Sequence, residues 1–362
     1  MLILKPCCLG DVLMATPLAR ALATAWPDAR IDWAVDAHSR PALAGNPHVD
    51  GRLVDATGCV RGAYAPWAIA RLAFAVVAGR YDVAFVPDRS PVLALVAWLG
   101  RIPRRVGLDS RLRGRLYTVR VPVPYERHEI ELYLDLARAV GLPAGDARPV
   151  FVPSAADHRA AARVLAELPP DGRPVVVHPG GGENPGQTLL AKRWPPARFA
   201  GLVARLGAWS GARFVLVGGP GDREAARAVL AALPAEVAQA GGQTPFVLDA
   251  AGRLSFGETA ALVAGCDLYI GNDTGATHLA AAVGAPVLAV FGPTDPGRYG
   301  PLPGIGVAVA PRSGAVDRLA DAEGSRAIEG VGVDDVLTAA RALLIARLFA
   351  PSRVDLWPTS ES

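Results

Sequence analysis

The chain has 362 residues, of which 51% are hydrophobic and 20% are charged, and its net charge is +3 at pH 7. This length predicts two domains of ordinary size, each with an ample apolar core. The small net charge gives no indication of a nucleic-acid partner. No apolar run approaches the roughly 18 residues that a membrane span needs, and no basic segment precedes an apolar one at the N-terminus. We therefore expect a cytoplasmic protein, with peripheral contact at the inner face of the cytoplasmic membrane as a further option.

The first half predicts strands and helices in alternation. Short apolar runs at 1–5, 31–35 and 81–86 predict strands, and the segments between them have helical spacing, beginning with Asp11 to Ala25. A helix around 129–140 leads into the Gly- and Pro-containing stretch 141–146, which is the best linker candidate.

The same alternation starts again in the second half. Strands are predicted at 175–178, 214–217, 246–249, 268–270 and 287–290. Helices are predicted at 195–208, 223–233, 257–265 and 275–283. Short buried strands separated by helices indicate parallel sheets covered on both faces. The predicted class is α/β, with two Rossmann-like doubly wound domains at 1–150 and 151–345, an irregular loop at 311–330 and a tail at 346–362.

Four cysteines, of which Cys7 and Cys8 are adjacent, do not have the pattern of a disulfide framework. Their spacing also matches no common metal site, so we expect no structural zinc.

Ligands of open parallel sheets bind beyond the carboxyl ends of the strands. This rule selects 7–11 in the first domain and 178–182, 218–222 and 272–275 in the second, which we expect to face a cleft between the domains. Glycines in these loops allow backbone N–H groups to approach phosphate, although turn chemistry explains them equally well. Neither G-x-G-x-x-G after the first strand nor G-x-x-x-x-G-K-[ST] is present.

Two acidic residues lie at predicted helix starts. Asp273, Thr274 and Gly275 lead from a strand into a helix, and His278 lies in its first turn. Such a helix N-terminus offers N–H donors and a positive dipole to a diphosphate, but Asp273 or Thr274 could equally be an N-cap. Asp11 could act as a general base toward a hydroxyl, or could cap its own helix.

Lys5 and Lys192 are the only lysines among 37 basic residues. A crowded phosphate site favours the compact ammonium over the wide guanidinium, whereas chance survival in an arginine-rich sequence is the alternative. The stretch from Arg101 to Arg127 has eight arginines against Asp109 and Glu126. It predicts contact with an anionic substrate or membrane, or else a solvated loop. No D-x-D pair occurs, so a bound diphosphate is expected to be held by dipoles and cations without an obligatory metal.

Several motifs together resemble one family. They are 5–18 (Lys-Pro-Cys-Cys-Leu-Gly-Asp onward), 46–50, His-Pro-Gly at 178–180, 191–195, 273–286 and 291–296. In this order they resemble glycosyltransferase family 9, the ADP-heptose:lipopolysaccharide heptosyltransferases, over roughly residues 1–345. The resemblance implies a GT-B fold, with acceptor binding in the first domain and nucleotide-sugar binding in the second. It also implies inverting, metal-independent transfer of heptose from ADP-heptose, or a related nucleotide-diphosphate sugar, to a glycan hydroxyl such as that of the lipopolysaccharide inner core.

By this resemblance Asp11 is the general base and Lys192 neutralises the leaving diphosphate. The implied donor-binding residues are His178, Gly180, Thr188, Asp222, Glu224, Asp273, Thr274, Gly275 and His278. Asp222 and Glu224 compete for the ribose hydroxyls. The implied acceptor-binding residues are Lys5, Cys7, Cys8, Gly10 and His128.

Rival functions stay open at this point. The acceptor could be a natural product such as an aminoglycoside or a nucleoside. A sugar-nucleotide epimerase would not need Asp11, and a catalytically silent sugar-nucleotide-binding scaffold would bind ADP without transfer. Cys7 and Cys8 stand where many family members carry polar residues, and 311–330 lacks the cysteine-rich stretch that some of them have.

Overall fold

A computed structural model describes residues 1–60, 63–109, 114–170, 174–184, 187–311 and 328–349. The chain divides into two compact units, each with its own sheet. Unit 1 comprises Met1–Val152 and Glu183–Thr188, and unit 2 comprises Pro153–Gly182 and the chain from Leu189 onward. Most of the predicted loop at 311–330 and most of the predicted tail lie outside the described residues.

The sheet of unit 1 has six parallel strands in the order β3-β2-β1-β6-β7-β8. The strands are β1 (Leu2–Leu4), β2 (Asp32–Val35), β3 (Leu53–Asp55), β6 (Val83–Val86), β7 (Arg104–Asp109) and β8 (Val119–Pro122). A two-stranded hairpin lies beside it, formed by β4 (Cys59–Val60) and β5 (Ala63–Tyr64).

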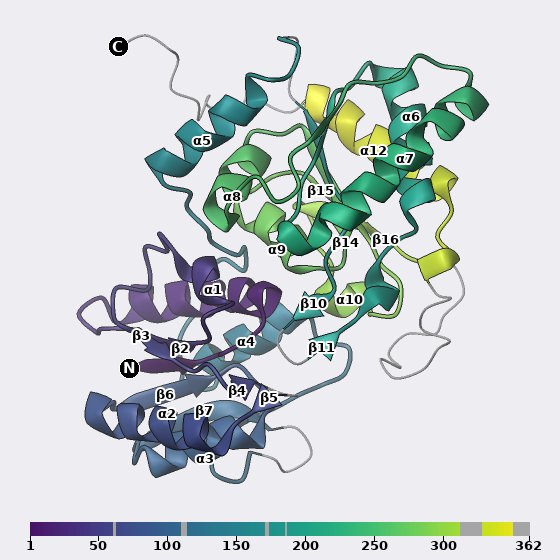
Figure 1. The fold of residues 1–362 in the computed structure, drawn as a ribbon. Helices are drawn as coiled ribbons and strands as arrows, with labels where there is room; N and C mark the ends of the chain where they lie inside the picture. Colours follow the sequence, from purple (N-terminus) through teal and green to yellow (C-terminus); the bar gives the residue numbers. More distant parts are fainter. Residues whose placement is uncertain (61–62, 110–113, 171–173, 185–186, 312–327, 350–362) are drawn as a thin grey trace. The chain divides into compact units, whose positions relative to one another are not determined.

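Helices cover both faces of this sheet (Figure 1). α1 (Leu9–Ala25) packs beside α4 (Glu129–Arg138), and α2 (Pro66–Gly79) packs beside α3 (Pro91–Leu99). A short 3₁₀ helix, η1 (Arg40–Leu43), contacts α1. Alternate strand residues such as Leu2 and Leu4 face α2 and α3, where Leu72 and Leu93 complete one core. The period of two along a strand thus gives each face of the sheet its own apolar layer.

The sheet of unit 2 repeats the same strand order, as β13-β12-β9-β14-β15-β16. Its strands are β9 (Val175–His178), β12 (Phe214–Leu216), β13 (Val247–Asp249), β14 (Leu268–Asn272), β15 (Val287–Val290) and β16 (Gly306–Val309). The helices are α5 (Ala155–Leu165), α6 (Pro196–Ser210), α7 (Arg223–Ala240), α8 (Phe256–Ala264), α9 (Gly275–Ala282), α10 (Pro296–Tyr299) and α12 (Val333–Leu348). Its short elements are η2 (Leu190–Lys192) and η3 (Pro220–Asp222), whereas the hairpin of β10 (Glu183–Asn184) and β11 (Gln187–Thr188) is grouped with unit 1.

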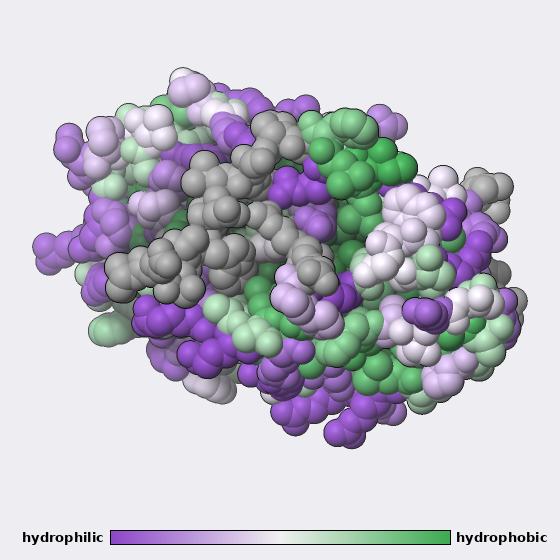
Figure 2. Space-filling view, turned by 90° about the horizontal axis from the view of Figure 1, so that it is seen from above, coloured by the Kyte–Doolittle hydropathy of each residue, from purple (hydrophilic) through white to green (hydrophobic). Residues whose placement is uncertain are grey.

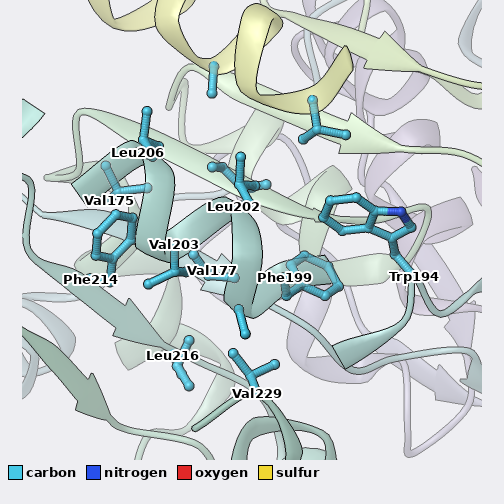
Figure 3. Close-up of a cluster of buried hydrophobic side chains, with 14 of the residues drawn as sticks. Val175, Val177, Trp194, Phe199, Leu202, Val203, Leu206, Phe214, Leu216 and Val229 are labelled. Carbon is cyan, nitrogen blue, oxygen red and sulfur yellow. The ribbon is translucent and has the colours of Figure 1, made fainter. Parts of the chain in front are cut away.

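The core of unit 2 is built on α6 (Figure 3). Phe199, Leu202, Val203 and Leu206 follow the helical period and pack against strand residues such as Val177. Trp194, fully buried, packs edge-on against Phe199 with ring centroids 4.9 Å apart. The segment immediately before α6 is therefore anchored in the core.

Both sheets reverse their strand order at an inner position. The reversal falls between β1 and β6 in unit 1 and between β9 and β14 in unit 2. In doubly wound sheets the crevice at the carboxyl ends of these two strands is where ligands bind. The predicted class, α/β with two doubly wound parallel sheets, is confirmed.

Some elements differ from their predicted extent. α7 continues to Ala240 although Pro234 lies inside it, because Leu233 and Val237 pack into the core on both sides of the proline. α12 runs to Leu348, so the first residues of the predicted tail are helical. The strands β3, β7, β8 and β16 were not predicted.

Seen from above, hydrophilic side chains surround several apolar stretches (Figure 2). None of the described helices is both long enough and apolar enough to span a membrane.

Candidate functional site

Lys5 bridges the two strand ends at the crevice of unit 1. It follows β1, and its Nζ lies 2.9 Å from Oδ2 of Asp88, which follows β6, and 3.2 Å from Oδ2 of Asp11. Burial lowers the pKa of the Lys5 ammonium, but Asp11 and Asp88 outweigh burial and hold this pKa above its usual value. Lys5 is therefore a fixed positive charge between two carboxylates.

Asp11 is the third residue of α1, whose N-cap is Cys8, so the alternative that Asp11 caps the helix is wrong. Its carboxylate lies in the first turn, where the helix dipole favours negative charge. The side chain is 35% exposed, and Oδ1 makes no hydrogen bond within the part of the chain that the structure describes. Asp11 thus has the exposure and the free acceptor oxygen that proton abstraction requires.

The other predicted acceptor residues are at the N-terminal ends of α1 and α4. Adjacent Cys7 and Cys8 are joined by a disulfide bond, which links neighbouring residues and forms no framework between distant segments. Gly10 is buried within α1. His128 is the N-cap of α4, where its Nδ1 accepts a hydrogen bond from the N–H of Ile130 at 3.2 Å.

Among the described residues of the stretch from Arg101 to Arg127, some arginines bind groups within unit 1 and others are exposed. The Arg105 guanidinium donates to the carbonyl oxygens of Leu116 and Ile102. Arg120 pairs with Asp109, and Arg127 pairs with Asp135. Arg111 and Arg113 lie outside the described residues. Several of these charges are therefore used inside unit 1.

Asn272 joins three segments at the crevice of unit 2. It ends β14 and is fully buried. Its amide donates to the carbonyl oxygens of Pro179 and Gly180 at 3.1 Å, and its Oδ1 accepts from the N–H of Trp194 at 2.9 Å. The indole of Trp194 also donates to the carbonyl oxygen of Val331 at 2.9 Å. Together these bonds fix the short segment that carries Lys192.

Lys192 and Asp273 form an ion pair in this crevice. Nζ of Lys192 lies 2.6 Å from Oδ2 of Asp273, which also accepts from Oγ1 of Thr294 at 2.5 Å. Nε2 of His278 lies 3.8 Å from the other carboxylate oxygen. Burial raises the pKa of Asp273, but Lys192, His278 and the two hydrogen bonds outweigh it and hold this pKa below its usual value.

Thr274 is the N-cap of α9, yet its side chain makes no capping bond. The alternative that Thr274 is the N-cap residue is therefore confirmed in position, although its hydroxyl makes no capping bond. Its Oγ1 is buried without a partner in the described residues, and so is Nδ1 of His178. A Cβ on Gly181, whose φ is +87°, would lie 2.4 Å from Cγ2 of Thr274 and 3.2 Å from the His178 ring. Two unpartnered polar atoms thus lie close together beside the positive end of a helix, next to Gly275.

Asp222 accepts hydrogen bonds from the loops that follow β9 and β12. Its carboxylate accepts from the N–H groups of Gly181 at 2.7 Å and Gly219 at 2.9 Å, and it lies 3.2 Å from Nε2 of His178. Burial raises the pKa of Asp222, but these bonds and the charge of His178 hold it far below its usual value. A Cβ on Gly180 would lie 2.1 Å from this carboxylate, so a larger residue at position 180 would clash with Asp222.

Two further predicted donor residues belong to other elements. Glu224 is exposed in the first turn of α7. Thr188 is in β11, opposite Glu183 in a hairpin grouped with unit 1, and its side chain is outside the described part of the structure.

Sequence reasoning missed Asp88, Asn272 and Thr294. Asp88 follows a predicted strand by two residues, so the strand-end rule could have selected it. Asn272 begins one of the loops that the strand-end rule selects, and Thr294 lies in a family motif, but neither residue type alone indicates a role in the site. The described residues contain no group of three or more His, Cys, Asp or Glu that could hold a metal ion.

Two doubly wound sheets of the same strand order, each with a lysine–carboxylate pair at its switch point, are the architecture of the GT-B class of two-domain proteins. Residues 69–311 match the family described as Glycosyltransferase family 9 (heptosyltransferase). Lipopolysaccharide heptosyltransferase 2 of Escherichia coli (strain K12) is 31% identical over 312 residues, which are 83% of this chain and 85% of that protein.

Two solved structures of related enzymes resemble the fold of this chain. The structure of E. coli ADP-heptose lps heptosyltransferase II has a TM-score of 0.72 and 26% identity, over 96% of this chain and 99% of that one. A family 9 glycosyl transferase from Veillonella parvula has a TM-score of 0.76 and 21% identity, over 95% and 97% of the two chains. The chain belongs to glycosyltransferase family 9, and it is a glycosyltransferase with the GT-B fold.

Proposed function

We propose that this enzyme is an inverting, metal-independent heptosyltransferase that uses ADP-heptose, or a closely related nucleotide-diphosphate sugar. The observation that carries the proposal is the Lys192–Asp273 pair at the N-terminus of α9, beside the unpartnered Oγ1 of Thr274. A cation, a helix dipole and an unused hydroxyl are together suited to a diphosphate. The name of the E. coli relative, an ADP-heptose enzyme, supports the same donor.

On the donor side, the diphosphate would contact Lys192, the N–H groups of Thr274 and Gly275, and the Thr274 hydroxyl. Asp273 holds Lys192 in place, and His278 faces the same carboxylate. Positive charge supplied by a lysine and by backbone dipoles leaves no obligatory role for a metal. His178, Gly180 and Thr188 are proposed to complete the donor site.

The ribose is better assigned to Glu224 than to Asp222. Both oxygens of Asp222 already accept hydrogen bonds from Gly181, Gly219 or His178 within unit 2. Glu224 is exposed at the start of α7. Its carboxylate can therefore accept both ribose hydroxyls without breaking an internal contact.

On the acceptor side, Asp11 would remove the proton of the acceptor hydroxyl as its oxygen attacks the anomeric carbon. The new carbon–oxygen bond forms opposite the breaking bond to ADP, so the anomeric configuration inverts. Lys192 and the start of α9 would stabilise the charge that builds on the leaving diphosphate. Lys5 would hold the Asp11 carboxylate in position through the 3.2 Å contact to its Oδ2, and Cys7, Cys8, Gly10 and His128 would line the acceptor side.

The proposed acceptor is a hydroxyl of the lipopolysaccharide inner core, following the named substrate of the relatives. A natural-product alcohol, such as an aminoglycoside or a nucleoside, uses the same donor chemistry. We place the reaction in the cytoplasm, where nucleotide sugars are available as donors.

The test combines transfer and binding measurements on Asp11→Ala. We expect transfer from ADP-heptose to fall by about 10²-fold or more, because the proton acceptor is lost, while ADP affinity stays within about twofold. Asp28→Ala removes an exposed carboxylate just beyond α1 and serves as the matched control.

Unchanged turnover in Asp11→Ala would rule out Asp11 as the base. Binding of ADP by the unaltered protein without transfer to any acceptor would instead favour the catalytically silent scaffold.

A further inference from the structure

The outward faces of α2 and α3 are apolar where a soluble protein has polar residues. On α2, Trp67 is 65% exposed, Phe74 76% and Val77 44%. On α3, Trp98 is 50% exposed and Leu99 42%, and Leu95 continues the same stripe. The opposite sides of both helices already fill the core with Leu72, Val76 and Leu93. These helices are therefore apolar on both sides, which is typical of helices with a further apolar partner.

The two stripes form one surface because α2 and α3 pack side by side on the same face of the sheet (Figure 1). The exposed positions follow the helical period on each helix, at 67, 74 and 77 and at 95, 98 and 99. We call these six residues and the backbone that carries them the α2–α3 face.

The charges around the α2–α3 face are positive. No Asp or Glu occurs from Tyr64 to Arg80 or from Pro91 to Arg104. Arg80, Arg101 and Arg104 are exposed at or just beyond the ends of the two helices, and their side chains make no ion pair within the described residues. Of the acidic residues next to the two helices in the structure or the chain, Asp55 pairs with Arg71, Asp88 pairs with Lys5, and Asp82 lies two residues beyond Arg80.

We propose that the α2–α3 face docks on an anionic lipid bilayer. Trp and Phe side chains partition into the boundary between headgroups and acyl chains, and arginines at the rim attract anionic headgroups. A second copy of this chain is a weaker fit, because a two-fold interface brings the same rim of unpaired arginines toward itself. The proposal assigns a surface of unit 1 and does not depend on the proposed reaction.

The test is co-sedimentation of the full chain with vesicles of phosphatidylglycerol and phosphatidylcholine, compared with vesicles of phosphatidylcholine alone. We expect binding to the anionic vesicles that weakens as salt increases, because the rim charges are exposed to solvent. Phe74→Glu should lower the vesicle affinity about tenfold or more, and Trp67→Glu should act in the same direction.

Phe246→Glu is the matched control, because Phe246 is exposed on unit 2 and should leave vesicle affinity unchanged. Arg101→Gln with Arg104→Gln should reduce the preference for anionic vesicles. Circular dichroism and ADP binding would establish that each variant is folded.

Absence of vesicle binding, or equal binding by the Phe74→Glu variant and the unaltered chain, would overturn the proposal. Light scattering that finds a dimer dissociated by Phe74→Glu, without vesicle binding, would assign the α2–α3 face to a second copy instead.

Discussion

Lys5 and Lys192 each pair with carboxylates at the switch point of their own sheet, Asp11 and Asp88 in one unit and Asp273 in the other. Lys5 directly follows β1, whereas Lys192 lies further along the chain from β9, in η2. The Lys5 side chain is only 5% exposed, and its Nζ lies 5.7 Å from the centre of the Tyr133 ring. A planar guanidinium is wider than an ammonium, so these crowded sites favour lysine for a physical reason.

Replacing Lys192 tests whether size matters in addition to charge. We expect Lys192→Arg to lower kcat about tenfold. The wider arginine guanidinium cannot both keep the 2.6 Å contact to Asp273 and direct a positive charge toward the diphosphate. Lys192→Met should lose about 10²-fold or more, because the charge itself is gone. Steady-state kinetics with saturating acceptor gives both values, and full activity of the arginine variant would remove the size argument.

At the scale of elements, strand ends could be predicted from the sequence but the bonds between them could not. The apolar runs before His178 and Asp273 are strands that end at His178 and at Asn272, and the strand-end rule could select these ends because it depends on local pattern alone. The partners of Asn272 lie 78 to 93 residues away in the chain, so no local pattern indicates them. The same holds for Asp222, whose bonds to the loop after β9 join two segments that are separate in sequence.

Three of the four edge strands, β3, β8 and β16, were not predicted, and neither was the inner strand β7. β3 and β16 are mostly half-buried, so their sequences lack the continuous apolar run that marked the inner strands. β7 begins with two arginines, so its sequence has no continuous apolar run that would predict a strand. Burial in the folded sheet, which depends on neighbouring strands, decides these segments more than their own composition does.

Asn272→Ala should weaken both the fold and nucleotide binding. Removing the amide leaves the N–H of Trp194 and two carbonyl oxygens unpaired in a fully buried place, at a cost of about 3 kcal/mol in the free energy of unfolding. ADP affinity should fall as well, because the segment carrying Lys192 loses its anchor. Urea unfolding and calorimetric titration measure the two effects, with the exposed amide in Gln239→Ala as control. Loss of stability without loss of ADP affinity would separate Asn272 from the donor site.

For the whole molecule, the two units share one architecture and both depend on ionised carboxylates. In unit 1, the pKa values of Asp32, Asp55 and Asp135 are lowered, since their hydrogen bonds and nearby arginines outweigh burial. In unit 2 the same is true of Asp222 and Asp273. A carboxylate whose folded pKa lies below its unfolded value contributes stability above the unfolded pKa, and this stability is lost as pH falls through the folded pKa.

Acid should therefore destabilise the folded chain from about pH 5 downward, as the unfolded carboxylates, with pKa values near 4, begin to take up protons that the folded ones do not. Asp222→Asn should lower the free energy of unfolding by about 3 kcal/mol at pH 7, because charge-assisted bonds to Gly181 and Gly219 are weakened. The gap between variant and unaltered chain should narrow between pH 5 and pH 3, since the unaltered chain alone loses the contribution of this carboxylate. Urea midpoints at several pH values measure this difference. Asp28→Asn, at an exposed position, is the control and should have the same free energy of unfolding as the unaltered chain at every pH. A gap that stays constant from pH 7 to pH 3 would mean that the Asp222 carboxylate does not link proton uptake to unfolding.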